Sequence, residues 1–197
     1  MKRVLCCIAL FALLFALGGC AHQATTAGDM EADEFLRQVA KPARRLKSET
    51  GLWYYLRDDG KVHRMIAMED IQQNRVETNV TFELTALETV EEGDVGQVYL
   101  SYTIRNGMDN ALDPFGKVEV AVLLKDGWYV MPNVPTEDFG EKLESGGSRE
   151  GVVNIATIEN TYLPDGRYRI QLKIDDLSYA YLEFKVENIA GGIHITA

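Results

Sequence analysis

The chain has 197 residues, enough for one domain of ordinary size with a sizeable apolar core, since 46% of its residues are hydrophobic. It carries 30 acidic and 20 basic residues, for a formal charge of −10. Such a surface repels phosphate backbones, so we do not expect nucleic acid as a partner. Three cysteines and three histidines leave too few ligands for the common zinc sites.

The amino end has the organisation of an export signal. Met1-Lys2-Arg3 supply the positive start, and Val4 to Leu17 form an apolar core of about 14 residues. A membrane-spanning helix needs about 20 apolar residues, because the hydrocarbon core is about 30 Å thick. We therefore expect residues 1–19 to be a cleaved signal helix, whose removal takes Lys2 and Arg3 away and changes the formal charge from −10 to −12.

The apolar core ends in Leu17-Gly18-Gly19-Cys20, which resembles the bacterial lipobox, a branched apolar residue and two small residues before an invariant cysteine. The resemblance implies that Cys20 receives a diacylglyceryl group, that the Gly19–Cys20 bond is cleaved, and that the chain is a lipoprotein held at the membrane. The absence of Asp after the cysteine implies, by resemblance to enterobacterial sorting, the outer membrane with the domain facing the periplasm. The alternative is an ordinary signal peptide with a cysteine there by chance. Since Cys6 and Cys7 are removed, no disulfide is expected.

Two segments precede the main domain. Residues 20–33 are small and polar, which predicts a lipidated N-terminus followed by a flexible tether. Residues 34–74 predict a short helix and a β-hairpin. Phe35, Leu36 and Val39 form one face of the helix, and the apolar runs 52–57 and 61–68 flank an Asp-Gly pair typical of a tight turn.

Residues 75–188 have the period-2 pattern of β-strands. The clearest alternation runs continuously from Arg75 to Ala86, with Val76 and Phe82 among the positions expected on the buried face. About seven short strands with no strong helix between them predict an antiparallel β-sandwich, followed by a C-terminal tail at residues 189–197. The remaining strands are predicted at 98–104, 118–124, 128–131, 152–158, 167–174 and 179–186.

Two of these segments carry a family resemblance. Tyr99 to Gly107 and Leu163 to Ile170 resemble the strand-to-turn and final-hairpin segments of bacterial immunoglobulin-like envelope domains. The resemblance implies an immunoglobulin-like β-sandwich. Only the architecture carries over, because the chain lacks the Cys…Trp…Cys core of antibody domains.

The sequence offers little chemistry. His22, His63 and His194 are the only histidines, and no nucleophile motif accompanies them, so we expect no enzyme and no cofactor. One loop gathers hard oxygen ligands of the kind that calcium prefers, with a plain inter-strand loop as the alternative interpretation. Its four residues are Asn106, Asp109, Asn110 and Asp113.

Aromatic side chains are the main candidates for a binding role. They gather at Trp53-Tyr54-Tyr55 and at Trp128-Tyr129. Neighbouring strand residues face opposite sides of a sheet, so each cluster places a ring away from the face on which its neighbour packs. Trp53, Tyr55, Trp128 and Tyr129 are therefore candidate contacts, with core packing as the alternative. They fit a non-catalytic binding or assembly module for an envelope protein or, as a second hypothesis, a lipoprotein that binds peptidoglycan or polysaccharide.

Overall fold

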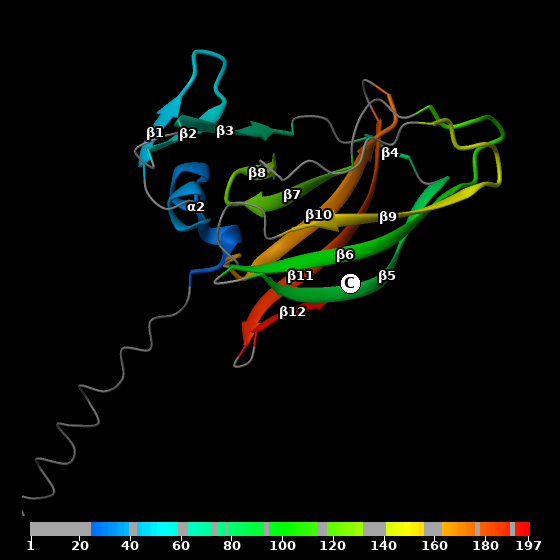
Figure 1. Ribbon diagram of the computed structural model, residues 1–197. Helices are drawn as coiled ribbons and strands as arrows, with labels where there is room; N and C mark the ends of the chain where they lie inside the picture. The colour runs from blue at the N-terminus through cyan, green and yellow to red at the C-terminus, as the bar shows by residue number, and fades with distance from the viewer. Residues whose placement is uncertain are drawn as a thin grey trace, which may run out of the picture.

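The computed structural model describes the chain from residue 25 onward with gaps, so the predicted signal peptide and Cys20 lie outside the described part. The described residues are mostly β-strand, in antiparallel sheets (Figure 1). No helix among them is long and apolar enough to cross a membrane. The described ranges are 25–39, 43–58, 63–71, 75–77, 79–92, 95–113, 118–131, 141–155, 163–175, 178–189 and 192–197.

One sheet has three strands, in the order β5 (Val80–Glu92), β6 (Val95–Asn106) and β9 (Ser148–Asn154), all antiparallel. The alternation in β6 is confirmed, since its even-numbered residues from Val98 to Ile104 are buried. The β5–β6 register shifts between Leu84 and Ala86, an irregularity that bends a strand and increases its twist.

The larger sheet has nine strands, in the order β1-β2-β3-β8-β7-β10-β11-β12, with β4 beside β11. Its centre consists of β8 (Gly127–Val130), β7 (Val118–Leu124), β10 (Gly166–Lys173) and β11 (Ser178–Ile189). The even-numbered residues of β7, and those of β10 from Tyr168 to Leu172, are buried and join the residues of β6 in one core cluster. The odd-numbered residues therefore form the opposite, outer face of this sheet.

The predicted hairpin is confirmed and belongs to this larger sheet. It pairs β2 (Trp53–Asp58) with β3 (His63–Asp70), and β1 (Ala43–Lys47), which the sequence pattern missed, adds a third strand. The end of β3 pairs with β8 and so joins the hairpin to the rest of the sheet: Glu69 pairs with Val130, and Asp70 pairs with Tyr129.

The predicted helix is also confirmed, as α2 (Ala32–Val39), and it lies beside the hairpin (Figure 1). Its apolar face is fully buried, with Phe35 and Leu36 at 0% exposure and Val39 at 1%. Burial of that face, rather than the helix propensity of eight residues, stabilises so short a helix.

The prediction of a flexible tether is wrong for its second half. A short 3-10 helix, η1 (Ala27–Asp29), packs into the domain, and Ala27 and Met30 are completely buried. The N–H of Ala27 donates to the carbonyl of Asp165 at 2.6 Å, and the carbonyl of Met30 accepts from the N–H of Lys125 at 3.0 Å. A Cβ atom on Gly166 would lie 2.7 Å from the Cβ of Ala27. The small residues that are typical of a linker therefore permit close backbone packing here.

Two strand boundaries differ from the prediction. The strand expected from Arg75 to Ala86 is divided into β4 (Arg75–Val76), which pairs in parallel with β11, and β5, which lies in the other sheet. Val76 is consequently 44% exposed and not buried. The expected tail contains β12 (Gly192–Thr196), which pairs with β11 and places Ile193 and Ile195 against the core. Alternation has the same period in both sheets, so it does not reveal where a chain changes sheet.

Candidate functional site on the outer face of the large sheet

The outer face of the large sheet brings together aromatic and basic side chains from three strands. Trp128 comes from β8, Arg169 from β10 and Tyr181 from β11. The Cζ atom of Arg169 lies 4.4 Å from the ring centroid of Trp128 and 4.9 Å from that of Tyr181, both within cation–π range. We call these three residues the aromatic–arginine row.

Strand register explains why the row forms. Arg169 pairs with Ala121 of β7, a small residue at an outward position that is 0% exposed. A larger side chain at position 121 would compete with Arg169 for the space between β8 and β10. The two rings reach Arg169 from strands on either side of β10, and only 4% of this arginine remains exposed.

A chain of polar side chains continues from the row. The Nε of Arg169 donates to Oε1 of Gln171 at 2.8 Å, and Nε2 of Gln171 donates to Oε2 of Glu119 at 3.1 Å. Gln171 is completely buried, so both ends of its amide are held in place. Burial raises the pKa of Glu119, although the hydrogen bond from Gln171 opposes that rise. Burial disfavours the charged form of Arg169 in the same way, and for a base this lowers the pKa.

Two neighbouring basic residues on this face form ion pairs with carboxylates. Arg167 forms an ion pair with Glu183, and Lys185 forms one with Glu187. Arg169 differs from both, because within the described part of the chain its guanidinium has one hydrogen bond, to the neutral Gln171, and two ring contacts.

The predicted aromatic contacts separate into two places. Trp53 pairs with the buried Met68, whereas the next residue, Glu69, pairs with Val130 on the Trp128 side, so the two tryptophans lie on opposite faces of the sheet. Trp53 is half-buried, packs against the core and carries the Lys47 ammonium 4.9 Å from its ring centroid. Core packing, the alternative interpretation, therefore holds for Trp53.

The expectation for Tyr129 as a contact is wrong. Its side chain is 6% exposed, and its hydroxyl donates to Oδ2 of Asp126 at 2.9 Å. Burial, followed by this hydrogen bond, raises the pKa of Tyr129, so the phenol stays protonated. Tyr55 lies in β2, and its side chain falls outside the described residues.

The candidate calcium loop has a structural role instead. The side chain of Asn106 is buried, and its Nδ2 donates to the carbonyls of Leu143 (2.9 Å), Asn110 (3.0 Å) and Glu144 (3.2 Å). Its Oδ1 accepts from the N–H of Met108 at 3.0 Å. Asp113 lies 3.2 Å from the Nζ of Lys142, and Asp109 and Asn110 are exposed. The described residues contain no group of three or more His, Cys, Asp or Glu side chains that could hold a metal.

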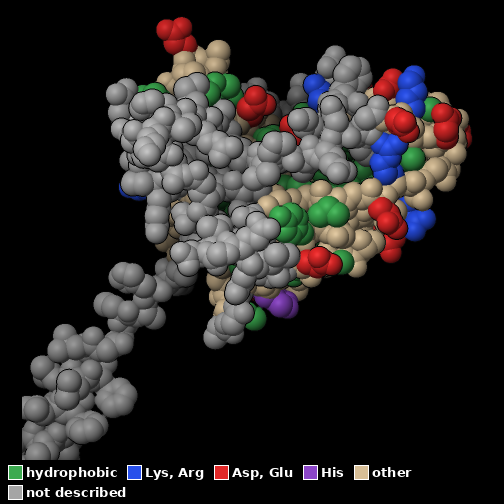
Figure 2. All heavy atoms as spheres, viewed as in Figure 1, with side chains coloured by type: hydrophobic (Ala, Val, Ile, Leu, Met, Phe, Trp, Pro, Cys, Tyr) green, Lys and Arg blue, Asp and Glu red, His purple; other side chains and the backbone are tan. Residues whose placement is uncertain are grey.

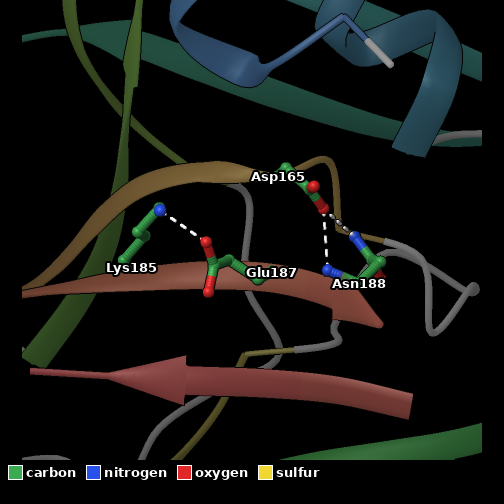
Figure 3. Close-up of polar contacts among 4 residues, drawn as sticks. All are labelled: Asp165, Lys185, Glu187 and Asn188. Atoms are coloured by element: carbon green, nitrogen blue, oxygen red, sulfur yellow. Dashed lines mark hydrogen bonds and ion pairs between the residues drawn. The ribbon is translucent and has the colours of Figure 1, made fainter. Parts of the chain in front are cut away.

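A shallow pocket of about 330 Å³ lies where η1 meets β10 and β11. Asp165 stands at its edge, and Oδ1 of Asp165 accepts from the N–H and Nδ2 of Asn188 at 2.8 and 2.7 Å (Figure 3). Lys185 and Glu187, which also line the pocket, pair with each other. These side chains satisfy one another, so the pocket is a weaker candidate than the row.

The sequence pattern did not identify Arg169 and Tyr181. Their signal is visible in hindsight, because the β10 residues Arg167, Arg169, Gln171 and Lys173 occupy every outward position in an otherwise acidic protein. On the side of the molecule where the three-stranded sheet lies, acidic and basic side chains are interspersed (Figure 2).

Comparison with protein families, with characterised proteins and with solved structures gives no match to this chain.

Proposed function

We propose that this protein is a bacterial envelope lipoprotein, anchored through lipid on Cys20 to the outer membrane and facing the periplasm, that binds a protein partner without catalysis. The lipobox resemblance of Leu17-Gly18-Gly19-Cys20 supports the anchor. Two or three acyl chains would give a lasting attachment, since a single chain binds a bilayer only reversibly.

We further propose that the sandwich is immunoglobulin-like. The three-stranded sheet β5-β6-β9 has the neighbour order of strands A, B and E of that fold, and β8-β7-β10-β11 has the order C′, C, F and G. A second feature supports this assignment. Tyr168, near the start of β10 in the place of strand F, donates its hydroxyl to the carbonyl of Pro164 at 2.8 Å, as in the tyrosine corner of such domains.

The observation that carries the binding proposal is the aromatic–arginine row. Trp, Tyr and Arg are the residue types that dominate the energetics of protein interfaces. Here two half-buried rings hold a guanidinium in a fixed position, so less side-chain entropy is lost when a partner binds.

The same geometry favours a protein over a glycan. Sugars stack on the flat faces of aromatic rings, and Arg169 already covers one face of Trp128 and one face of Tyr181. Glycan binding remains the second hypothesis, because the half-buried carboxylate of Glu119, next to the row, could hydrogen-bond hydroxyl groups.

The test is a crosslinked pull-down of the tagged, natively lipidated chain from its own envelope, read by mass spectrometry. Trp128→Ala and Tyr181→Ala should each reduce capture of one stoichiometric partner by about tenfold, the effect expected of an interface hot spot. The matched control is Val152→Ala, which removes an apolar side chain that is 52% exposed on the three-stranded sheet, and capture should be unchanged.

Two further arms separate the parts of the proposal. Cys20→Ala should abolish palmitate labelling, and retained labelling would exclude Cys20 as the anchor. Sedimentation with isolated sacculi that is lost in Trp128→Ala, with no protein captured, would support glycan binding in place of a protein partner.

A further inference from the structure

The partner's chemistry follows from what Arg169 lacks. A guanidinium carries five N–H donors in one plane, and rings stacked over its faces satisfy none of them. One donor, at Nε, is used by Gln171. Among the residues that the structure describes, the two terminal nitrogens of Arg169 have no hydrogen-bond acceptor.

Such an arrangement is costly for a side chain that is only 4% exposed. A buried charge normally has an opposite charge beside it, and Arg167 on the same strand meets that rule through Glu183. The carboxylate at the end of the polar chain, Glu119, reaches Arg169 only through the neutral amide of Gln171. Glu183 lies opposite Arg169 on β11 and attracts its charge, but its direct ion pair is with Arg167. The guanidinium of Arg169 is therefore held in place by the fold without a carboxylate bound directly to it.

We infer that Arg169 is the anchor of a carboxylate-binding site, in which an acidic side chain of a protein partner enters between Trp128 and Tyr181 and pairs with the guanidinium. This inference rests on the proposed function and names the chemistry of its partner. A carboxylate fits because its two oxygens match the parallel N–H groups of the arginine fork. The half-buried rings exclude water from the pair, which strengthens it.

The test uses the full lipidated chain in detergent micelles, in a Trp53→Phe background that leaves Trp128 as the one fluorescent indole. A hexaglutamate peptide is the probe, and hexaserine is the neutral control. Hexaglutamate should change Trp128 fluorescence saturably and hexaserine should not. Arg169→Gln should weaken the apparent affinity by about tenfold or more, since truncating one member of a buried charge pair is costly.

Arg167→Gln is the matched control, because it removes the same charge from an exposed position two residues away on the same face. It should weaken binding by no more than about twofold. Arg169→Lys keeps the charge but loses the fork, so its affinity should fall about fivefold, and this milder variant protects the test if Arg169→Gln does not fold.

Four outcomes would overturn the inference. Equal losses in Arg167→Gln and Arg169→Gln would indicate non-specific attraction, and full binding by Arg169→Lys would exclude bidentate pairing. Tighter binding of an oligogalacturonate than of hexaglutamate would assign the site to an anionic glycan. If no acidic probe binds while Trp128→Ala still loses its partner in the pull-down, the carboxylate site is wrong and the protein-binding proposal stands.

Discussion

Two buried polar side chains of this protein, Asn106 and Arg169, are treated very differently by the fold. Asn106 is 1% exposed and has a partner at both ends of its amide: three carbonyl oxygens share the two N–H donors of Nδ2, and Oδ1 accepts from the N–H of Met108. Arg169 is 4% exposed, carries a full charge and makes one hydrogen bond, to Gln171. A fully satisfied buried group specifies the fold, whereas an incompletely satisfied charge at a sheet face is poised for a ligand.

The largest expected effect is the loss of stability when Asn106 is replaced. Asn106→Asp replaces the donating amide by a carboxylate that faces the carbonyls of Leu143, Asn110 and Glu144. We expect the free energy of unfolding to fall by about 3 kcal/mol, because the buried acceptors lose their donor and a charge is buried without a partner. Urea denaturation measures this loss.

Asn110→Asp is the control in the same loop, since Asn110 is exposed. It should change the free energy of unfolding by less than about 0.5 kcal/mol. A comparable loss in both variants would mean that the loop responds to added charge in general, and the special role of Asn106 would be wrong.

An effect of intermediate size, on binding of the partner, is expected when Arg169 is replaced. Arg169→Met keeps an unbranched stem beside Trp128 and Tyr181 but removes the guanidinium. Because a buried charge without an ionic partner contributes little stability, we expect unfolding free energy to change by less than about 1 kcal/mol, while capture of the partner is lost. Arg169→Ala also removes the stem and should unfold more easily. A loss of several kcal/mol in Arg169→Met would make Arg169 a structural residue like Asn106.

The smallest effect concerns Glu119. Its pKa is raised in the folded state by burial, so the folded protein holds this proton more tightly than the unfolded chain does. Stability is therefore lost as pH rises above the unfolded value of about 4.5, and the cost is complete once the folded carboxyl has ionised. Glu119→Gln removes that cost and should raise the melting temperature by about 1–3 °C at pH 7.

The pH dependence makes the Glu119 prediction specific. As pH falls to 4 and below, Glu119 becomes protonated in both the folded and the unfolded chain, so the melting temperatures of Glu119→Gln and the natural chain should converge. Glu150→Gln, at an exposed position on β9, is the matched control and should give no such pH-dependent difference. A difference that stays constant from pH 4 to 7 would contradict an origin in the ionisation of Glu119.

The comparison also explains how much the sequence could predict. Alternation located the buried faces of β6 and β7, and helical spacing located Phe35, Leu36 and Val39, because each pattern reports burial within a single element. These patterns could not show that Val76 lies in the large sheet and not in the sheet of β5, or that Ile193 belongs to a strand. Both facts depend on pairing with β11, which is distant in the sequence from Val76.

The candidate site was predictable only in part, because sequence patterns report on single strands and the site joins several. Trp128 and Tyr129 were expected to face opposite sides of a sheet, and they do. The meeting of Trp128 with Arg169 and Tyr181 depends on the strand order β8-β7-β10-β11, which joins residues from three separate segments. Likewise, the oxygens of Asn106 and Asp113 suggested calcium, but Asn106 contacts Leu143 through its nitrogen, a contact that spans 37 residues.

The docking of Ala27 sets a limit on where this domain can work. Seven residue steps separate Cys20 from Ala27, and an extended chain covers at most about 3.6 Å per residue, so they reach about 25 Å. With the lipid on Cys20 that we propose, the domain is held close to the bilayer surface and samples a shallow zone above it. Its effective concentration toward other membrane-bound proteins is correspondingly high, and a weak contact at Arg169 would suffice to keep two such neighbours together.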